Sequence, residues 1–338
     1  MKKEALLDVS VLLLFFNRPE TFGKVFEAVR QARPARLFLY QDGARNEHDL
    51  PGIEACREIA SHIDWECEVH HYYQERNFGC DPSEYISQRW AFSLTEKCIV
   101  LEDDAVPALS FFTFCKEMLD RYENDDRITM ISGFNIDEQT TDVAQDYFFT
   151  SAFSIWGWAS WRRVVSQWEG DYAFLEDEQT LRQLKALVKE RHLRSDFIKM
   201  CQDHRDAGKE FYESIFWAHM LLSSGLAIMP RLNQIASMSA TDNSTHFSSL
   251  KTMPRGLRRI FTMKSHELKF PLSHPRYVVE HVAYSQRLYR VHAWGHPWVK
   301  VARSFEELFL NLRYGNFAHI GRSIARRLQK WTGTFKHA

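Results

Sequence analysis

The first 135 residues alternate between short, uniformly apolar runs and stretches in which apolar residues recur at helical spacing. Runs such as residues 9–16 and 37–40 predict strands buried on both faces of a sheet. Between them, Phe22, Val25 and Val29 follow the period of a helix that begins at Pro19. Strand and helix alternate in this way five times, which predicts an α/β fold with a doubly wound sheet and a parallel core.

Three consecutive carboxylates follow the apolar run 99–101: Glu102, Asp103 and Asp104. In α/β sheets the ligand crevice lies outside the carboxyl ends of the strands. Three adjacent acids repel one another, so one interpretation is a divalent cation held by carboxylate and phosphate oxygens. The alternative is a solvated turn that happens to be acidic.

Two other polar corners, residues 17–18 and 41–43, follow earlier predicted strands and are expected to meet the acidic triplet. The sequence contains neither G-x-G-x-x-G nor G-x-x-x-x-G-K-[ST], so it predicts neither a dinucleotide fold nor a P-loop.

After residue 150 the regular alternation of predicted strands and helices ends. Trp156, Trp158 and Trp161 lie around Gly157, and such a wall suits the apolar C–H faces of sugar rings. Three core aromatics under a loop are the alternative. Residues 174–207 predict two charged helices and residues 213–224 a further helix.

Composition narrows the function classes. The formal net charge is −1, so no global basic field predicts a nucleic-acid partner. The six cysteines form no C-x-x-C pair, which argues against a structural zinc site and favours reduced core thiols of a cytoplasmic protein.

Seven motifs in order resemble those of GT-A glycosyltransferases. They are F-N-R-P-E (16–20), Q-D-G (41–43), R-N-F-G-C (76–80), V-L-E-D-D (100–104), I-S-G (131–133), I-W-G-W-A-S-W-R-R (155–163) and S-G-L-A-I-M-P (224–230). Their spacing is similar to that of bacterial hemolysin-like or family-2-like glycosyltransferases and, more distantly, to that of N-acetylglucosaminyltransferase I. The resemblance covers about residues 8 to 250.

The resemblance implies an inverting enzyme with a UDP-linked sugar donor and Mn or Mg. It assigns donor-binding roles to five positions: the uridine to Arg18 and Asp42, the ribose and donor sugar to Glu102 and Asp103, and the edge of the sugar pocket to Trp158. It makes Asp104 the metal ligand. The acceptor would be a hydroxyl of a glycan or of a lipid-linked glycan.

The resemblance also implies a catalytic acid at the start of the late helix, where this chain has Glu213. The family has Asp there, so Glu213 is a departure, and a helix-start acid that complements the dipole is the alternative. A second departure is Asp81, where a basic residue is expected. His246 is a candidate metal or phosphate contact, although a lone loop histidine is more often neither.

The expected architecture is a Rossmann-like mixed sheet followed by a helical extension. Its parts are a catalytic domain (1–250, with a nucleotide half at 8–135 and an acceptor half at 136–250) and a basic C-terminal extension (251–338). After Glu307 there is no acid, while apolar residues at 317, 320, 324, 328 and 331 share one helical face. A peripheral membrane contact through 313–336, at the inner face of the membrane, is one interpretation, and a helix docked on its own domain is the other.

Two rival functions remain open at this point. A sugar-nucleotide nucleotidyltransferase would also need acidic metal ligands, but it usually carries a Gly-rich loop near the first strand. A non-catalytic carbohydrate-binding protein on a transferase-like fold would need no base.

Overall fold

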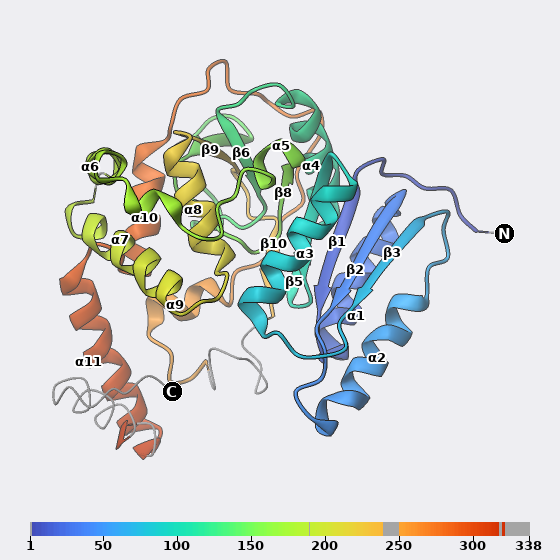
Figure 1. Ribbon diagram of the computed structural model, residues 1–338, viewed down its shortest axis with the longest axis horizontal. Coiled ribbons are helices and arrows are strands. Elements are labelled where there is room, and N and C mark those ends of the chain that lie inside the picture. Colours follow the sequence, from blue (N-terminus) through green and yellow to red (C-terminus); the bar gives the residue numbers. More distant parts are fainter. Residues whose placement is uncertain (1, 189, 239–249, 318–319, 322–338) are drawn as a thin grey trace.

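The structure is a computed structural model, and it describes residues 2–188, 190–238, 250–317 and 320–321. Its centre is a mixed sheet in the order β3–β2–β1–β4–β8–β6–β9–β7 (Figure 1). The strands are β1 (Ser10–Phe15), β2 (Arg36–Gln41), β3 (Glu68–Tyr73), β4 (Lys97–Glu102), β6 (Ile128–Ser132), β7 (Tyr147–Thr150), β8 (Trp158–Trp161) and β9 (Leu226–Pro230). A small second sheet pairs β5 (Ala105–Pro107) with β10 (Ile235–Ser237).

One half of the sheet is parallel. β3, β2, β1 and β4 run in the same direction, with Leu14 opposite both Tyr40 and Glu102. All six residues of β1 are buried, which explains the uninterrupted apolar run in the sequence. This parallel register brings the carboxyl ends of β1, β2 and β4 to one edge, as the alternation predicted.

The other half is mixed. β8 lies antiparallel between β4 and β6, β6 pairs in parallel with β9, and β7 closes the edge antiparallel to β9. All four residues of β8 are buried. The Trp cluster around Gly157 therefore includes a core strand, which the sequence pattern did not predict because a Gly precedes it and only four residues form it.

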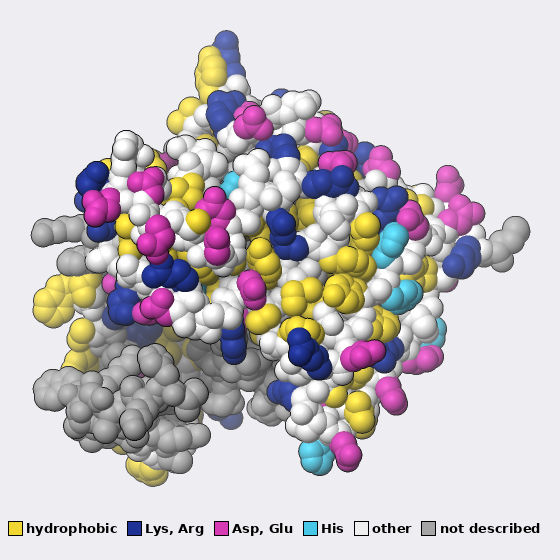
Figure 2. All heavy atoms as spheres, in the orientation of Figure 1, with side chains coloured by type: hydrophobic (Ala, Val, Ile, Leu, Met, Phe, Trp, Pro, Cys, Tyr) yellow, Lys and Arg dark blue, Asp and Glu magenta, His cyan; other side chains and the backbone are white. Residues whose placement is uncertain are grey.

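Helices flank the sheet (Figure 1). They are α1 (Pro19–Ala32), α2 (Leu50–Ser61), α3 (Cys80–Leu94), α4 (Leu109–Arg121), α5 (Arg162–Val165), α6 (Glu178–Leu187), α7 (Arg191–Asp206), α8 (Tyr212–Leu222), α9 (Arg255–Ile260), α10 (Val282–His292) and α11 (Pro297–Arg313), with 3₁₀ turns η1 (Glu47–Asp49) and η2 (Ala173–Glu176). The helices expected in the first 135 residues are confirmed. Over α6 and α7, acidic and basic side chains are interspersed on the surface (Figure 2), as expected of two charged helices.

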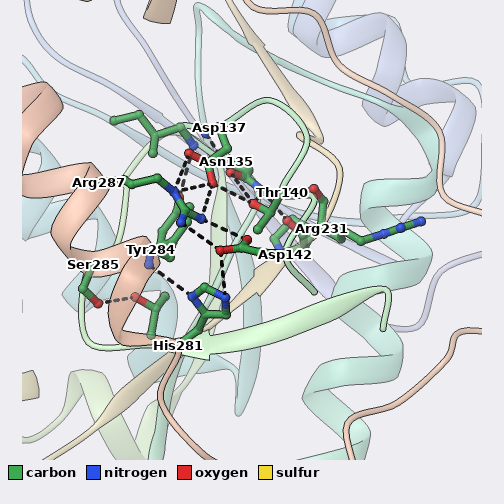
Figure 3. Close-up of polar contacts among 12 residues, drawn as sticks. Asn135, Asp137, Thr140, Asp142, Arg231, His281, Tyr284, Ser285 and Arg287 are labelled. Carbon is green, nitrogen blue, oxygen red and sulfur yellow. Dashed lines mark hydrogen bonds and ion pairs between the residues drawn. The ribbon is translucent and has the colours of Figure 1, made fainter. Parts of the chain in front are cut away.

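The segment after residue 250 is packed against the sheet. Tyr284 and Leu288 of α10 belong to the same buried core as β1 and β4. Arg287 lies 2.7 Å from a carboxylate oxygen of Asp137 and 3.0 Å from one of Asp142, and the Tyr284 hydroxyl accepts the backbone N–H of Ile136 (Figure 3). Residues on both sides of position 250 thus share one core.

The six cysteines are unpaired, and Cys56, Cys98, Cys115 and Cys201 are buried as expected. Of the described helices, none combines the length and apolarity needed to cross a lipid bilayer. Most of the predicted amphipathic tail, from residue 322 onward, lies outside the described residues.

Candidate functional site

The acidic triplet lies at the end of β4, in the middle of the main sheet. Its Asp103 and Asp104 are both buried, and both pair with the guanidinium of Arg18 from the corner after β1. The Arg18 Nη1 lies 3.0 Å from Asp104 Oδ2, and Asp103 also accepts the backbone N–H of Phe16 at 3.2 Å. Two of the predicted corners therefore meet, and Arg18 neutralises part of the repulsion.

Glu102 has no such partner. No basic side chain in the described part of the chain forms an ion pair with it. Burial raises the pKa of Glu102 well above its usual value, and the charges of Asp104, Asp103 and Glu213 add to the shift. The β4 end thus carries one carboxyl group that has no ion-pair partner among the described residues and whose protonated form is favoured.

A second group of acids faces Glu102 from the helices. Asp81 and Glu84 come from the first turns of α3, and Glu213 from the first turn of α8. One carboxylate oxygen of each lies within 4.8 Å of those of the other two. The sequence marked Asp81 only as a departure from the family pattern, and it gave no signal for Glu84, which lies four residues before Gln88 on a buried helix face.

Glu84 is the most constrained of these acids. Its side chain is buried, the Sγ of Cys80 lies 3.5 Å from Oε1, and Oε2 has no hydrogen-bond partner among the described residues. Burial raises the pKa of Glu84 well above its usual value, and the charges of Glu102, Glu213 and Asp81 raise it further. A buried, unpaired carboxylate is costly, so Glu84 favours either its protonated form or a bound cation.

Tyr212 supports the same inference. The residue is fully buried at the start of α8, and its hydroxyl has no hydrogen-bond partner in the described ranges. Burial raises the pKa of Tyr212, and the charges of Glu84 and Glu102 raise it further, so the phenol lies among the acids. An unpaired donor beside unneutralised oxygens is the environment that a bound water, cation or polar ligand completes.

The donor set is one that a divalent cation would accept. Asp81, Glu84 and Glu213 offer only carboxylate oxygens, which hard cations such as Mg²⁺ prefer. This acidic triad, in which Glu84 is buried and Asp81 and Glu213 are half-buried, could hold a metal ion. The predicted ligand Asp104 lies outside this triad and is already paired with Arg18.

The catalytic candidate Glu213 borders a cavity. Burial raises the pKa of Glu213 to about 6, and the charge of Asp81 contributes in the same direction. The neighbouring Tyr212 and Phe216 are buried, which agrees with the partial desolvation expected from the sequence. A carboxyl group with a pKa near neutrality is suited to proton transfer.

The cavity has a volume of about 420 Å³. Asp81 and Glu213 line it at one side, and much of the remaining wall is aromatic: Phe134, Phe153, Trp156, Phe211, Trp217 and Trp294. Tyr289 and His292 of α10 also contribute, so the segment after residue 250 helps to form the cavity. Apolar rings beside a few carboxylates form the type of pocket that binds a small polar ligand with apolar faces.

Trp158, which the sequence assigned to the sugar pocket, does not line this cavity. It is 1% exposed, packs against Phe92 and Phe216, and leaves its indole N–H without a hydrogen-bond partner in the part of the chain that the structure describes. Its neighbour Trp156 is the cluster member in the wall, in contact with the Phe134 ring. Trp158 belongs to the buried strand β8, whereas Trp156 lies in the loop that precedes this strand, where no strand pairing directs its side chain into the core.

The Asp42 carboxylate accepts hydrogen bonds from residues 77–79 of the loop before α3. Its carboxylate accepts the backbone N–H groups of Phe78 and Gly79 at 2.9 Å and the side-chain amide of Asn77 at 2.8 Å. At Gly43 a Cβ would lie 2.4 Å from the Arg76 carbonyl carbon, so the two chain segments pack backbone to backbone. Asp42 therefore anchors the 76–79 loop, and a uridine contact through it stays a prediction.

One polar relay was not predicted. His204 of α7 lines the cavity, and its Nδ1 lies 2.8 Å from the Ser214 hydroxyl, which in turn lies 2.6 Å from the Tyr172 hydroxyl. The His204 ring stacks on Phe211 with centroids 3.9 Å apart. Burial lowers the pKa of His204, which favours the neutral imidazole. In the sequence His204 is one polar residue in a charged helix, so nothing distinguished it.

His246, the second predicted metal ligand, lies outside the described residues. Comparison with known proteins adds no assignment, because no family model and no curated protein sequence matches the chain.

Proposed function

We propose that this chain is an inverting glycosyltransferase that moves a sugar from a UDP-linked donor to a hydroxyl of a glycan or lipid-linked glycan, with Mn²⁺ or Mg²⁺. One observation carries the proposal. A cluster of acids from α3 and α8 lies close to Glu102 at the end of the central strand β4, and two of its members, Asp81 and Glu213, line an aromatic cavity of about 420 Å³. The motif order, which resembles GT-A enzymes, supports the same reaction class.

Glycosyl transfer breaks the bond between the anomeric carbon and the diphosphate oxygen and forms a bond from that carbon to the acceptor oxygen. The electron pair leaves with the diphosphate, and the acceptor hydroxyl loses a proton. Glu213 takes that proton, since its pKa of about 6 leaves it ionised at neutral pH but still basic. Displacement by a hydroxyl on the face opposite the leaving group inverts the anomeric centre.

The leaving diphosphate needs positive charge, which Arg18 and a cation supply. A guanidinium binds phosphate oxygens in a bidentate manner, so Arg18 can exchange part of its pairing with Asp103 and Asp104 for the diphosphate. The exchange frees Asp104, which we assign as the cation ligand. A bound divalent cation neutralises charge that develops on the leaving group.

The aromatic wall receives the sugar rings. Trp156 and Phe134 present apolar surface, and the cavity edge presents the carboxylates of Asp81 and Glu213 as hydroxyl acceptors. We place Glu102 and Glu84 behind the donor sugar, where burial raises the pKa of each and favours the protonated form, which can donate a hydrogen bond to a hydroxyl.

A turnover assay tests the reaction class. The purified chain is incubated with a panel of nucleotide sugars and Mn²⁺, with and without oligosaccharide acceptors, and nucleoside diphosphate is measured. The proposal predicts release that depends on donor, acceptor and Mn²⁺ and is lost in Asp104→Asn. Pyrophosphate release from a nucleoside triphosphate and a sugar 1-phosphate would instead identify a nucleotidyltransferase. Nucleotide-sugar binding without any turnover would identify a non-catalytic binding protein.

A further inference from the structure

α11 presents an apolar face to solvent. Six large side chains on it are between 43% and 83% exposed: Trp298, Val301, Phe305, Leu308, Phe309 and Leu312. Their spacing of three, four or one residues along the helix places them on one face. Figure 1 shows α11 on the side of the molecule opposite the N-terminal end.

The polar side of α11 faces the protein instead. The Arg303 Nη2 donates a hydrogen bond to the Val291 carbonyl at 2.6 Å, and the Glu306 carboxylate accepts the backbone N–H of Arg255 at 2.8 Å. Asn311 is the buried residue of this helix. A surface helix ordinarily buries its apolar face, so the inverted orientation of α11 leaves a face available to an occupant.

Charge restricts the identity of that occupant. Residues 251–338 contain 17 Lys and Arg but 4 Asp and Glu, whereas residues 1–250 contain 26 and 40. The basic segment includes Arg255, Arg258 and Arg259 of α9, which line a surface hollow next to α11. An occupant that accepts Trp and Phe side chains and is also anionic satisfies both features.

We propose that α11 lies on an anionic lipid surface, with its apolar face in the headgroup region and the net positive charge of residues 251–338 attracted to the lipid phosphates. A second copy of the chain is disfavoured at this face, because a symmetric contact would bring two basic segments together. Residues 322–338 add five basic residues and no acid, so their charge also disfavours contact with this segment. The proposal does not depend on the glycosyltransferase assignment.

Vesicle sedimentation tests the proposal. The full chain is mixed with vesicles of phosphatidylglycerol and phosphatidylcholine in equal parts, or of phosphatidylcholine alone. Binding is expected to the anionic vesicles, to weaken as salt is raised, and to be weak on neutral vesicles. Phe305→Ser is expected to lower the partition coefficient about tenfold, because one aromatic ring no longer enters the interface.

Leu6→Ser is the matched control. Leu6 is 63% exposed and lies in the N-terminal segment, whereas Phe305 is 68% exposed, so both changes remove an exposed apolar side chain. The control should bind as the wild type does, and both variants should keep the wild-type melting temperature. Equal binding of wild type and Phe305→Ser, or no binding to anionic vesicles, contradicts the proposal. A concentration-dependent dimer that Phe305→Ser dissociates would assign the face to a second copy and overturn it. Removal of residues 322–338 that abolishes binding, with Phe305→Ser without effect, would overturn it in favour of that segment.

Discussion

The guanidinium Nη1 of Arg18 lies 3.0 Å from Oδ2 of Asp104, although the two residues are 86 positions apart in the chain. They meet because β1 and β4 are parallel neighbours, so the corners that follow them share one edge of the sheet. Arg18 forms ion pairs with Asp103 and Asp104, while Glu102, Glu84 and Glu213 remain without a basic partner among the described residues. The site thus contains one group of acids that pairs with Arg18 and a second group that has no basic partner among the described residues.

The two groups of acids are alternative binding sites for the cation, and the two alternatives predict opposite effects of substitutions. If Asp104 is the ligand during turnover, Asp104→Asn should raise the Mn²⁺ concentration for half-maximal activity tenfold or more, on the order of one lost charged ligand. Glu84→Gln should change this Mn²⁺ concentration less than about threefold, since Glu84 would then contact the donor sugar and not the cation. The measurement is a Mn²⁺ titration of turnover. The reverse ranking would place the cation at Asp81, Glu84 and Glu213 and remove Glu213 from the role of base.

Glu84 also gives a prediction for stability. The folded-state pKa of Glu84 is raised by burial first and then by neighbouring carboxylates, so the folded chain binds its proton more tightly than the unfolded chain does. The stabilisation is therefore present below the unfolded pKa and is lost as pH rises through the folded pKa. In cation-free buffer, Glu84→Gln should raise the free energy of unfolding by on the order of 2 kcal/mol at about pH 8 and by much less at about pH 5.

Thermal denaturation in the presence of a chelator measures this difference. Glu54→Gln, an exposed acid on α2, is the control and should leave the melting temperature unchanged at both pH values. A melting temperature of Glu84→Gln below that of the wild type at the higher pH would show that Glu84 makes a stabilising contact as a carboxylate, and the interpretation would fail.

The apolar runs predicted the parallel half of the sheet because strands buried on both faces leave a clear signal. The sequence also predicted that the acidic corner after β4 lies near Arg18, because the carboxyl ends of parallel strands meet at one edge of the sheet. β8 was not predicted, because four residues with two Trp carry no period that separates a strand from an aromatic loop. Glu84 and His204 were missed for a different reason: each acts through residues distant in sequence, such as Glu102 or Tyr172, and spacing along the chain carries no information on such contacts.

Trp158 and Trp156 are expected to have different roles: Trp158 packs in the core, and Trp156 contacts the ligand. Trp158→Ala should lower the free energy of unfolding by about 3–5 kcal/mol, because it leaves a cavity between Phe92 and Phe216. Trp158→Phe keeps a ring there and removes the unpaired indole N–H, so its effect should be smaller.

Trp156→Ala should instead change the melting temperature little and weaken ligand binding, with KM for acceptor or donor raised about tenfold through lost ring contact. Denaturant titration and steady-state kinetics on the three variants measure both effects. Equal destabilisation by Trp156→Ala and Trp158→Ala would contradict the assignment of Trp156 to the cavity wall.

The most direct test of the account is the turnover number of Glu213→Gln, measured with saturating nucleotide sugar and Mn²⁺ beside calorimetric affinities for both. The substitution keeps the size of the side chain and removes the proton acceptor. We predict that kcat falls about 100-fold or more, as general-base removal requires, while the dissociation constants for donor and Mn²⁺ stay within about threefold of the wild type. A wild-type kcat, or a loss of Mn²⁺ affinity that accounts for the whole decrease, would contradict the account.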